Sequence, residues 1–472
     1  MVKQGIKSQA GHLAAALAFL GSFCFFQFAY PYHLMRREQL NLFLFDGDYI
    51  SQTYRGTGWL VRFVADFLEQ FFHLPVAGPL IVALILTAIG WAAFKICRRF
   101  MGMWPSLAVG LLFFAWSFLR EMGNLYQTRY TLVVLGFLLL LLLALQFRKA
   151  WLQAVAAVVF LAAGAWALGT PYHKDYGKLW NVPKLDYERI IGLDVECVRE
   201  NWDKVLELSK VDLYMEEASY CYNLAHAMKG NLGETLLDHS QNHHLTLLFP
   251  VSSERAVFSN TLAGEAWFQL GDMTVAEQSA ITSLQASPRH TGARFLVRLA
   301  RVNLISGEDA AATKYLDILS KTLFYGKWAR SRMPGHQDES VRAELARARA
   351  RMMRRDFVHH SDNPRAVLHE LLKADPGNRA AREYLLCFDL MGYNLDGFIE
   401  DYVPDKIKGH LYNEAILIWL SQHDRLNPEE VARFGVDMSE VDRMNRFGRN
   451  PNAFRNTYWY YYLMAMQEAQ QR

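Results

Sequence analysis

Hydrophobic residues gather in five long stretches within the first 170 residues of the chain. The stretches cover roughly residues 12–30, 76–94, 105–119, 130–147 and 151–168, and none has a charged residue in its middle. A helix needs ~20 mostly apolar residues to cross a bilayer, so four stretches are long enough and the third is short. Trp104 and Arg120 are expected to mark the ends of the third. The pattern predicts five transmembrane helices within residues 1–170, with an external loop over residues 31–75.

From about Asp186 onward the apolar positions follow a helical period, with little alternation of period two. The clearest unit runs from Phe258 to Pro288 and is typical of two antiparallel helices. Small residues allow the helices to approach closely, a tryptophan fills the groove, and a proline ends the second helix; they are Gly264, Trp267, Gly271, Ala276, Ala280 and Pro288. This unit resembles a tetratricopeptide (TPR) repeat, whose period is ~34 residues.

Weaker copies of the same turn occur at residues 230–232 and 307–309, an earlier second helix is expected from residues 201–202, and residues 374–377 are typical of a repeat ending. We therefore expect residues 171–472 to form an all-α, TPR-like solenoid of about four to six helix pairs. The concave face of such an array usually binds peptides or partner proteins. The alternative is that the array only braces the membrane helices.

Charge is divided unevenly along the chain. Residues 1–170 hold 13 Lys/Arg and 6 Asp/Glu, a net charge of +7, and the other 302 residues hold 37 and 41, a net charge of −4. This division excludes a uniformly soluble protein, a disordered chain and a nucleic-acid binder driven by bulk positive charge. It indicates a membrane boundary near Thr170.

Basic residues near the ends of the apolar stretches predict the orientation of the chain. With a cytoplasmic N-terminus, seven of them lie on the cytoplasmic side against six on the other: Lys3, Lys7, Lys95, Arg98, Arg99, Arg148 and Lys149. An odd number of membrane crossings then places the C-terminal domain outside the cytoplasm.

The long loop after the first stretch contains the run Asn41-Leu42-Phe43-Leu44-Phe45, and an amphipathic helix is expected from about Gly58 to Phe72. That run, the sequence Phe71-Phe72-His73-Leu74-Pro75 and the C-terminal motif at residues 456–462 resemble an uncharacterised family of polytopic envelope proteins from Bacteroidota. The resemblance implies a bacterial inner-membrane protein with a periplasmic repeat domain. It implies no catalytic residue.

The same loop also has a fainter likeness to the GT-C class of membrane glycosyltransferases, which place an acidic residue in a long first external loop. Asp46 or Asp48 could serve there as a base or metal ligand near a lipid-phosphate donor. These enzymes generally have many more membrane helices than five. The alternative is that Asp46-Gly47-Asp48 forms a turn with a helix cap.

Two further groups of residues are candidates for chemistry. His239 and His243 are expected one turn apart on a single helix, a spacing that can bind Zn²⁺, although a third ligand and the HExxH pattern are missing. The alternative for this pair is a solvated polar helix end. Cys197 and Cys221 could form a disulfide, but buried free thiols are the favoured interpretation. No phosphate-binding loop or dinucleotide fingerprint is present, and no cofactor is predicted.

Tyr458-Trp459-Tyr460-Tyr461-Tyr462 predicts an aromatic helix that caps the last repeat or rests at the membrane surface. Together these patterns favour a membrane-anchored scaffold or adaptor that binds the lipid bilayer and an envelope protein. The alternative is a lipid-linked glycosyl or phospho-lipid transferase, or an inactive relative, using the first external loop.

Overall fold

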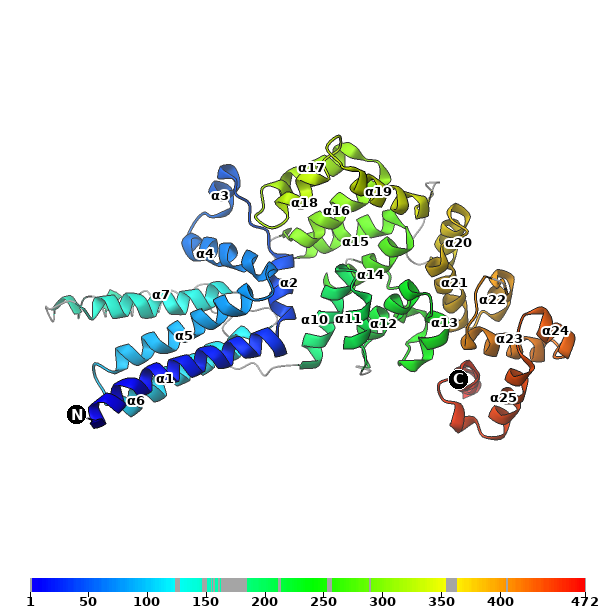
Figure 1. The fold of residues 1–472 in the computed structure, drawn as a ribbon, viewed down its shortest axis with the longest axis horizontal. Coiled ribbons are helices and arrows are strands. Elements are labelled where there is room, and N and C mark those ends of the chain that lie inside the picture. The colour runs from blue at the N-terminus through cyan, green and yellow to red at the C-terminus, as the bar shows by residue number, and fades with distance from the viewer. Residues whose placement is uncertain are drawn as a thin grey trace. The chain divides into compact units, whose positions relative to one another are not determined.

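The computed structural model describes residues 2–123, 128–146, 185–210, 214–252, 257–287, 290–353, 363–404 and 406–471, with a few positions between 151 and 162. Every regular element among these residues is helical, and none of them forms a strand (Figure 1). The all-α class is confirmed. The chain divides into two compact units, one formed by Met1–Ile191 with Ile318–Trp328 and the other by Gly192–Asp317 with Ala329–Arg472.

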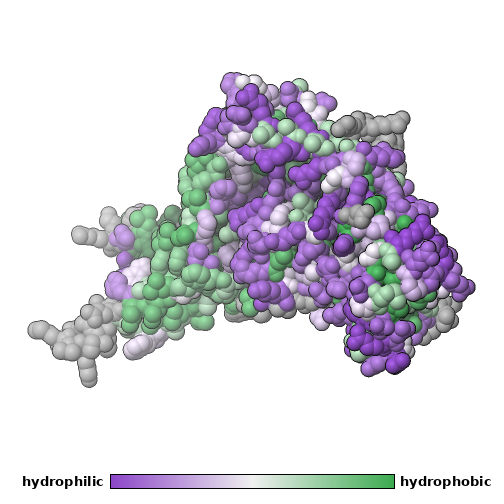
Figure 2. Space-filling model, turned by 45° about the vertical axis from the view of Figure 1, so that its right-hand side comes forward, coloured by the Kyte–Doolittle hydropathy of each residue, from purple (hydrophilic) through white to green (hydrophobic). Residues whose placement is uncertain are grey.

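Unit 1 contains the apolar helices. They are α1 (Val2–Cys24), which continues as a π-helical turn (Phe25–Ala29), α5 (Ala77–Cys97), α6 (Met103–Glu121) and α7 (Thr128–Ala144). Hydrophobic side chains cover the visible face of these helices, whereas the visible face of unit 2 is mostly hydrophilic (Figure 2).

Three segments of unit 1 are long and apolar enough to cross a membrane: Ala10–Ala29, Ala77–Cys97 and Met103–Glu121. The expectation of five is confirmed only for these three. The fourth stretch forms α7, which has 17 residues and is too short by the same measure. The fifth, 151–168, lies mostly outside the described residues.

The third apolar helix is longer than the sequence suggested. It extends over 19 residues, from Met103 to Glu121, and Trp104 and Arg120 each lie one residue inside its ends, close to where they were expected. The Arg120 side chain is 2% exposed. Against α5, the helix packs through two glycines: a Cβ on Gly110 would stand 2.7 Å from the carbonyl oxygen of Gly90. Small residues at such a crossing allow close backbone approach.

The external loop of the sequence interpretation folds as short helices: α2 (Tyr32–Leu40), α3 (Gly47–Thr53), α4 (Trp59–Glu69) and a 3₁₀ turn (Gln70–His73). The expected amphipathic helix is therefore present as α4. Ile318–Trp328 packs on the loop as part of the same unit. The Phe45 amide donates to the Lys321 carbonyl at 2.8 Å, and the Phe324 ring stacks on His73 at 5.0 Å between centroids.

Unit 2 is a succession of helices and helical turns. Its first half contains the second half of α10 (Leu185–Val198), α11 (Trp202–Leu208), α12 (Glu216–Lys229), α13 (Leu232–Thr235), α14 (Val257–Leu270), α15 (Met273–Ala286), α16 (Ala293–Ser306) and most of α17 (Asp309–Ser320). Its second half contains the second half of α18 (Gly326–Ser331), α19 (Glu339–Arg351), α20 (Pro364–Ala374), α21 (Arg379–Met391), α22 (Leu395–Asp401), α23 (His410–Gln422), α24 (Pro428–Arg433), α25 (Met438–Arg449) and α26 (Tyr458–Gln471).

The α14–α15 pair forms the helix hairpin that the sequence predicted. Gly264 lies against α15 so closely that a Cβ there would stand 2.3 Å from the Ser279 hydroxyl oxygen. Trp267 is fully buried, and Gly271 adopts φ +107° in the turn. The first turn of α15 is capped by Asp272, whose Oδ1 accepts a hydrogen bond from the Val275 amide at 3.0 Å. Of the other predicted hairpin residues, Ala276 and Ala280 are buried, and Pro288 lies outside the described residues.

The weaker copies vary in how completely they form hairpins. The pair α16–α17 turns at Gly307, with φ +82°, and its second helix buries Ala312 and Leu316 as expected. The pair α12–α13 turns at Gly230, but α13 has only four residues. Unit 2 is thus built partly from helix hairpins and partly from irregular helical turns.

The C-terminal aromatic helix packs into the core of unit 2. Tyr458 and Trp459 are 0% and 2% exposed. The Tyr458 hydroxyl donates to the Leu390 carbonyl at 2.9 Å, and the Trp459 indole N–H donates to the Glu414 carbonyl at 3.0 Å. These contacts agree with the interpretation that the aromatic helix caps the preceding helices, rather than with one that rests at the membrane surface.

Candidate functional site

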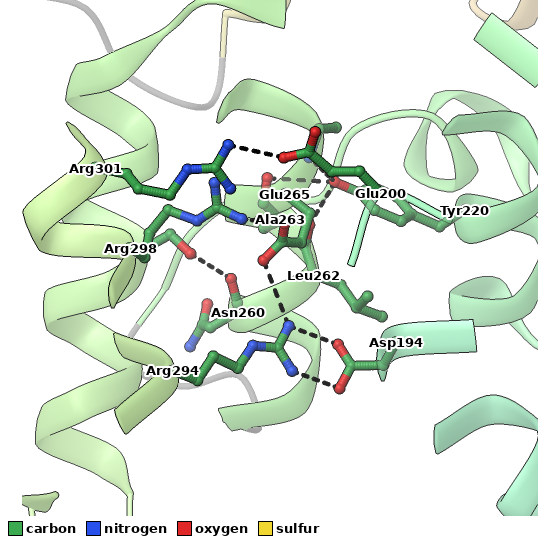
Figure 3. Close-up of polar contacts among 12 residues, drawn as sticks. Asp194, Glu200, Tyr220, Asn260, Leu262, Ala263, Glu265, Arg294, Arg298 and Arg301 are labelled. Atoms are coloured by element: carbon green, nitrogen blue, oxygen red, sulfur yellow. Dashed lines mark hydrogen bonds and ion pairs between the residues drawn. The ribbon is translucent and has the colours of Figure 1, made fainter. Parts of the chain in front are cut away.

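Three arginines on α16 form a largely buried polar cluster in unit 2. Arg294, Arg298 and Arg301 follow one another at helical spacing, so their side chains leave one face of the helix. Figure 3 shows them extending toward carboxylates from other helices. We call the six charged residues involved the arginine ladder; they are Asp194, Glu200, Glu265, Arg294, Arg298 and Arg301.

The inner part of the ladder is buried. Arg294 binds Asp194 of α10 through two parallel contacts, Nη1 to Oδ2 at 2.6 Å and Nη2 to Oδ1 at 2.7 Å. Its Nη2 is also 3.5 Å from Oε1 of Glu265 on α14, and Arg298 pairs with Oε2 of the same carboxylate. These four residues link three helices through charge-assisted hydrogen bonds.

The outer part of the ladder is more open. Arg301 pairs with Glu200 at 2.9 Å, and both side chains are partly exposed. The guanidinium carbons of Arg298 and Arg301 lie 3.7 and 4.6 Å from the centroid of the Phe268 ring. Stacking on an aromatic face helps to hold both guanidinium groups in place.

The electrostatics of the two buried arginines differ. Burial disfavours the charge of Arg294, but Asp194 and Glu265 more than offset this and raise its pKa. Burial lowers the pKa of Arg298, which shares Glu265 with Arg294 and lies beside Arg301. Three cations face three carboxylates, so the ladder holds no excess charge for an anionic ligand. Its geometry joins helices and is not that of an acid–base pair.

Sequence reasoning missed the ladder. Its signal is present, because three arginines at one helical face of an otherwise apolar segment are unusual. The carboxylate partners, however, come from two helices distant in sequence, and no local pattern connects them.

A second polar cluster lies among the short helices of unit 1. Arg37 pairs with Glu121, which is 1% exposed, and its Nη2 donates to the Glu121 carbonyl at 2.7 Å. The Thr131 hydroxyl donates to Glu121 Oε2 at 2.6 Å. Beside it, Glu188 Oε1 accepts the backbone amide of Tyr32 at 2.5 Å, at the N-terminus of α2, where a carboxylate is favoured.

The two candidate acids of the loop after α1 differ in their contacts. Asp46 caps α3 by accepting the Tyr49 amide at 2.9 Å through Oδ1, and its Oδ2 pairs with Lys321 at 2.6 Å. The hydrogen bond from the Lys321 ammonium, with that from Tyr49, lowers the pKa of Asp46, which makes it a weaker base. Asp48 lies in the first turn of α3 and is exposed. The interpretation as a turn with a helix cap therefore describes Asp46.

The predicted histidine pair does not share a helix, and this expectation is wrong. The helical segment ends at Asp238, His239 is extended, and His243 begins a separate 3₁₀ turn with φ +48°. The extended backbone at His239 places its ring on Tyr222, with 3.8 Å between the ring centroids, so the ring does not lie one helical turn from His243. Among the described residues, no three His, Cys, Asp or Glu side chains are grouped to hold a metal ion. Cys197 and Cys221 are buried free thiols.

Comparison with known families gives one match. A family model described as a family of unknown function, DUF6057, matches residues 6–174 and 172–465. The chain belongs to this family. The match covers the apolar helices and the helical region alike, so both units are part of the family's common architecture. No curated protein and no solved structure matches the chain.

Proposed function

We propose that this DUF6057 protein is a membrane-anchored scaffold that binds a partner protein through unit 2. In this proposal the apolar helices, five in all, hold the chain in the inner membrane of a bacterium. The N-terminus is cytoplasmic, and the helical hairpins form a TPR-like solenoid in the periplasm. Support comes from the three apolar segments of sufficient length and from the hairpins α14–α15 and α16–α17.

The observation that carries the proposal is the charge on α19. Arg342, Arg347 and Arg351 are exposed on this helix, and within the described part of the chain none of them pairs with a carboxylate. Each ladder arginine, in contrast, pairs with a carboxylate. Arg347 and Arg351 lie one turn apart on one side of the helix, and Arg342 lies about 140–180° around the helix from them. We call Arg347 and Arg351 the α19 basic face. Unpaired cations on a rigid helix suit an acidic protein surface, because complementary charge steers association and selects partners.

The test is in-cell photo-crosslinking of the full-length protein, with a crosslinker at the exposed Ala343, one turn before Arg347 on the same side of α19. The charge-reversal variant Arg347→Glu/Arg351→Glu is compared with the matched control Arg446→Glu/Arg449→Glu, which changes two exposed arginines of α25 by the same charge. We expect one partner to crosslink in the wild type and the control, and to be lost in the α19 variant at equal protein level. A partner that persists after charge reversal, or no specific partner at all, would contradict the proposal.

The alternative function, a transferase, makes a different prediction that can be tested in the same cells. Asp46→Asn and Asp48→Asn should abolish its activity, whereas a scaffold should tolerate both. Asparagine is an equally good helix cap, so Asp46→Asn removes the charge and keeps α3 in place. Loss of the cellular phenotype in either variant at normal protein level would favour the transferase.

A further inference from the structure

Helix α4 of the first loop exposes hydrophobic side chains and buries two of its charged ones. Its most exposed residues are hydrophobic: Trp59 is 48% exposed, Leu60 56% and Val64 36%. Two of its three charged residues, Asp66 and Glu69, are 5% and 6% exposed. A helix on the surface of a water-soluble domain shows the opposite distribution.

The buried charges of α4 have specific partners within unit 1. Asp66 Oδ2 accepts a hydrogen bond from the Tyr54 hydroxyl at 3.1 Å. The backbone carbonyl of Asp66 accepts one from the side-chain amide of Asn41 at 3.2 Å. Glu69 Oε1 accepts the Thr128 amide at the first residue of α7 at 3.2 Å. The remaining charged residue, Arg62, is half-buried, and its Nη2 donates to the Arg55 carbonyl. The polar face of α4 is therefore turned toward protein and not toward water.

The exposed face of α4 matches that of the apolar helices. On α5, a segment long enough to cross a membrane, Leu84 is 53% exposed, and on α7 Leu140 is 61% exposed. Helix α4 packs against α7 and runs alongside it in Figure 1. Its outer face thus continues the surface that those helices present.

We propose that the outer face of α4, formed by Trp59, Leu60 and Val64, is in contact with the acyl chains of the lipid bilayer. Helix α4 then belongs to the lipid-facing wall of the bundle and not to a water-exposed loop. With 11 residues it is about 16 Å long, roughly half of the ~30 Å hydrocarbon core.

Two physical arguments select lipid as the occupant. A helix that lies on a membrane surface keeps its charged face in water, but the charged face of α4 is covered by protein. Ionisable residues at membrane depth face the bundle interior and are hydrogen-bonded there, as Asp66 and Glu69 are. This inference rests on the membrane anchoring in the proposed function.

Spin labels on single cysteines test the inference in protein reconstituted into phosphatidylcholine–phosphatidylglycerol vesicles. The background is Cys24→Ser/Cys97→Ser, which removes the two cysteines that are not buried. Labels are placed at Val64→Cys and, as a second position, Leu60→Cys. The control for water is Gln52→Cys on α3, which is exposed, and the control for lipid is Leu84→Cys. Accessibility to oxygen, which concentrates in lipid, is compared with accessibility to a water-soluble nickel chelate.

We expect the oxygen-to-nickel ratio at Val64 and Leu60 to equal that at Leu84 and to exceed that at Gln52 several-fold. A ratio equal to that at Gln52 places α4 in water and overturns the inference. Low accessibility to both reagents means that protein covers the face, which also overturns it. If Leu84 itself behaves like Gln52, the membrane anchoring fails together with the inference, so the two failures are distinguishable.

Discussion

Arg294 and Asp194 form a two-pronged ion pair between helices that are 100 positions apart in the sequence. Their side chains are 5% and 1% exposed, so each charged group contacts the other in place of water. Such a pair contributes little net stability compared with two hydrophobic residues, but breaking it leaves an isolated buried charge.

Substituting one residue of this pair should therefore destabilise the protein far more than substituting both. We expect Asp194→Leu to destabilise the region around α16 by about 3–5 kcal/mol, and Asp194→Leu/Arg294→Met to recover most of that loss. Glu200→Gln, which breaks the partly exposed outer pair, should cost about 0–1 kcal/mol. Hydrogen exchange of the α16 amides in the purified full-length protein measures these differences. An effect of Asp194→Leu no larger than that of Glu200→Gln would refute the role of the ladder.

Gly264 is a position where the smallest added side chain should disturb packing. Its Cβ would meet both the hydroxyl oxygen and the Cβ of Ser279, at 2.3 and 2.7 Å, so Gly264→Ala must push α14 and α15 apart. We expect a loss of about 1–3 kcal/mol, partly restored by Ser279→Gly.

The control for Gly264 is Gly448→Ala in α25, where a new Cβ meets nothing within 4 Å. Alanine favours a helix over glycine by about 0.5–1 kcal/mol, so this variant should be stabilised. Denaturant unfolding of the two variants should give effects of opposite sign. Equal effects would mean that close packing at Gly264 does not matter.

Glu414 should make the C-terminal region of unit 2 sensitive to pH. Burial raises the pKa of this carboxyl from 4.5 to about 7, against the opposing effects of the Tyr458 amide, at 2.6 Å, and of Arg443. A raised carboxyl pKa means that the folded state binds the proton more tightly than the unfolded state. Stability should fall as the pH rises from about 4.5 to about 7, by about 3 kcal/mol in all.

Glu414→Gln cannot titrate and should abolish this pH dependence. The measurement is the hydrogen-exchange protection of α26 at pH 5 and at pH 7.5 in both proteins. The wild type should lose protection relative to the variant at the higher pH, after correction for the intrinsic exchange rate. An unchanged ratio between the two proteins would show that the Glu414 carboxyl is not protonated at pH 5.

Trp459 should anchor α26 as the terminal cap of unit 2. Its ring is 2% exposed, so Trp459→Ala should cost about 3–5 kcal/mol and free α26 for proteolysis. Tyr460→Ala, at a half-buried neighbour, should cost clearly less. Limited proteolysis followed by mass spectrometry of the C-terminal fragment compares them. Equal resistance of the two variants would contradict capping.

Several features of the fold could be predicted from local pattern alone. The apolar segments that form α1, α5 and α6 are visible because a membrane helix needs a long uninterrupted run. The α14–α15 hairpin could be predicted because the spacing of Gly264 and Gly271 is typical of a close helix contact followed by a turn. Helix α6 extends two residues beyond the predicted stretch at each end, and Trp104 and Arg120 lie close to those ends, as predicted.

The candidate chemistry was harder to predict. The Asp46-Gly47-Asp48 turn allowed both catalysis and capping, and only the positions of Tyr49 and Lys321 show what the Asp46 carboxylate binds. His239 and His243 looked like a pair because their spacing suits a helix, but spacing cannot reveal that the chain leaves the helix at Asp238.

The sequence by itself determined the helical class, the apolar segments and the most regular hairpin, because each depends on residues that are neighbours along the chain. Only the tertiary structure decided that Ile318–Trp328 packs with the first loop, that Asp194 neutralises Arg294, and that α4 turns its charges inward. These features depend on which distant side chains meet. The partners that a buried charged group finds there decide the free energy of burying it.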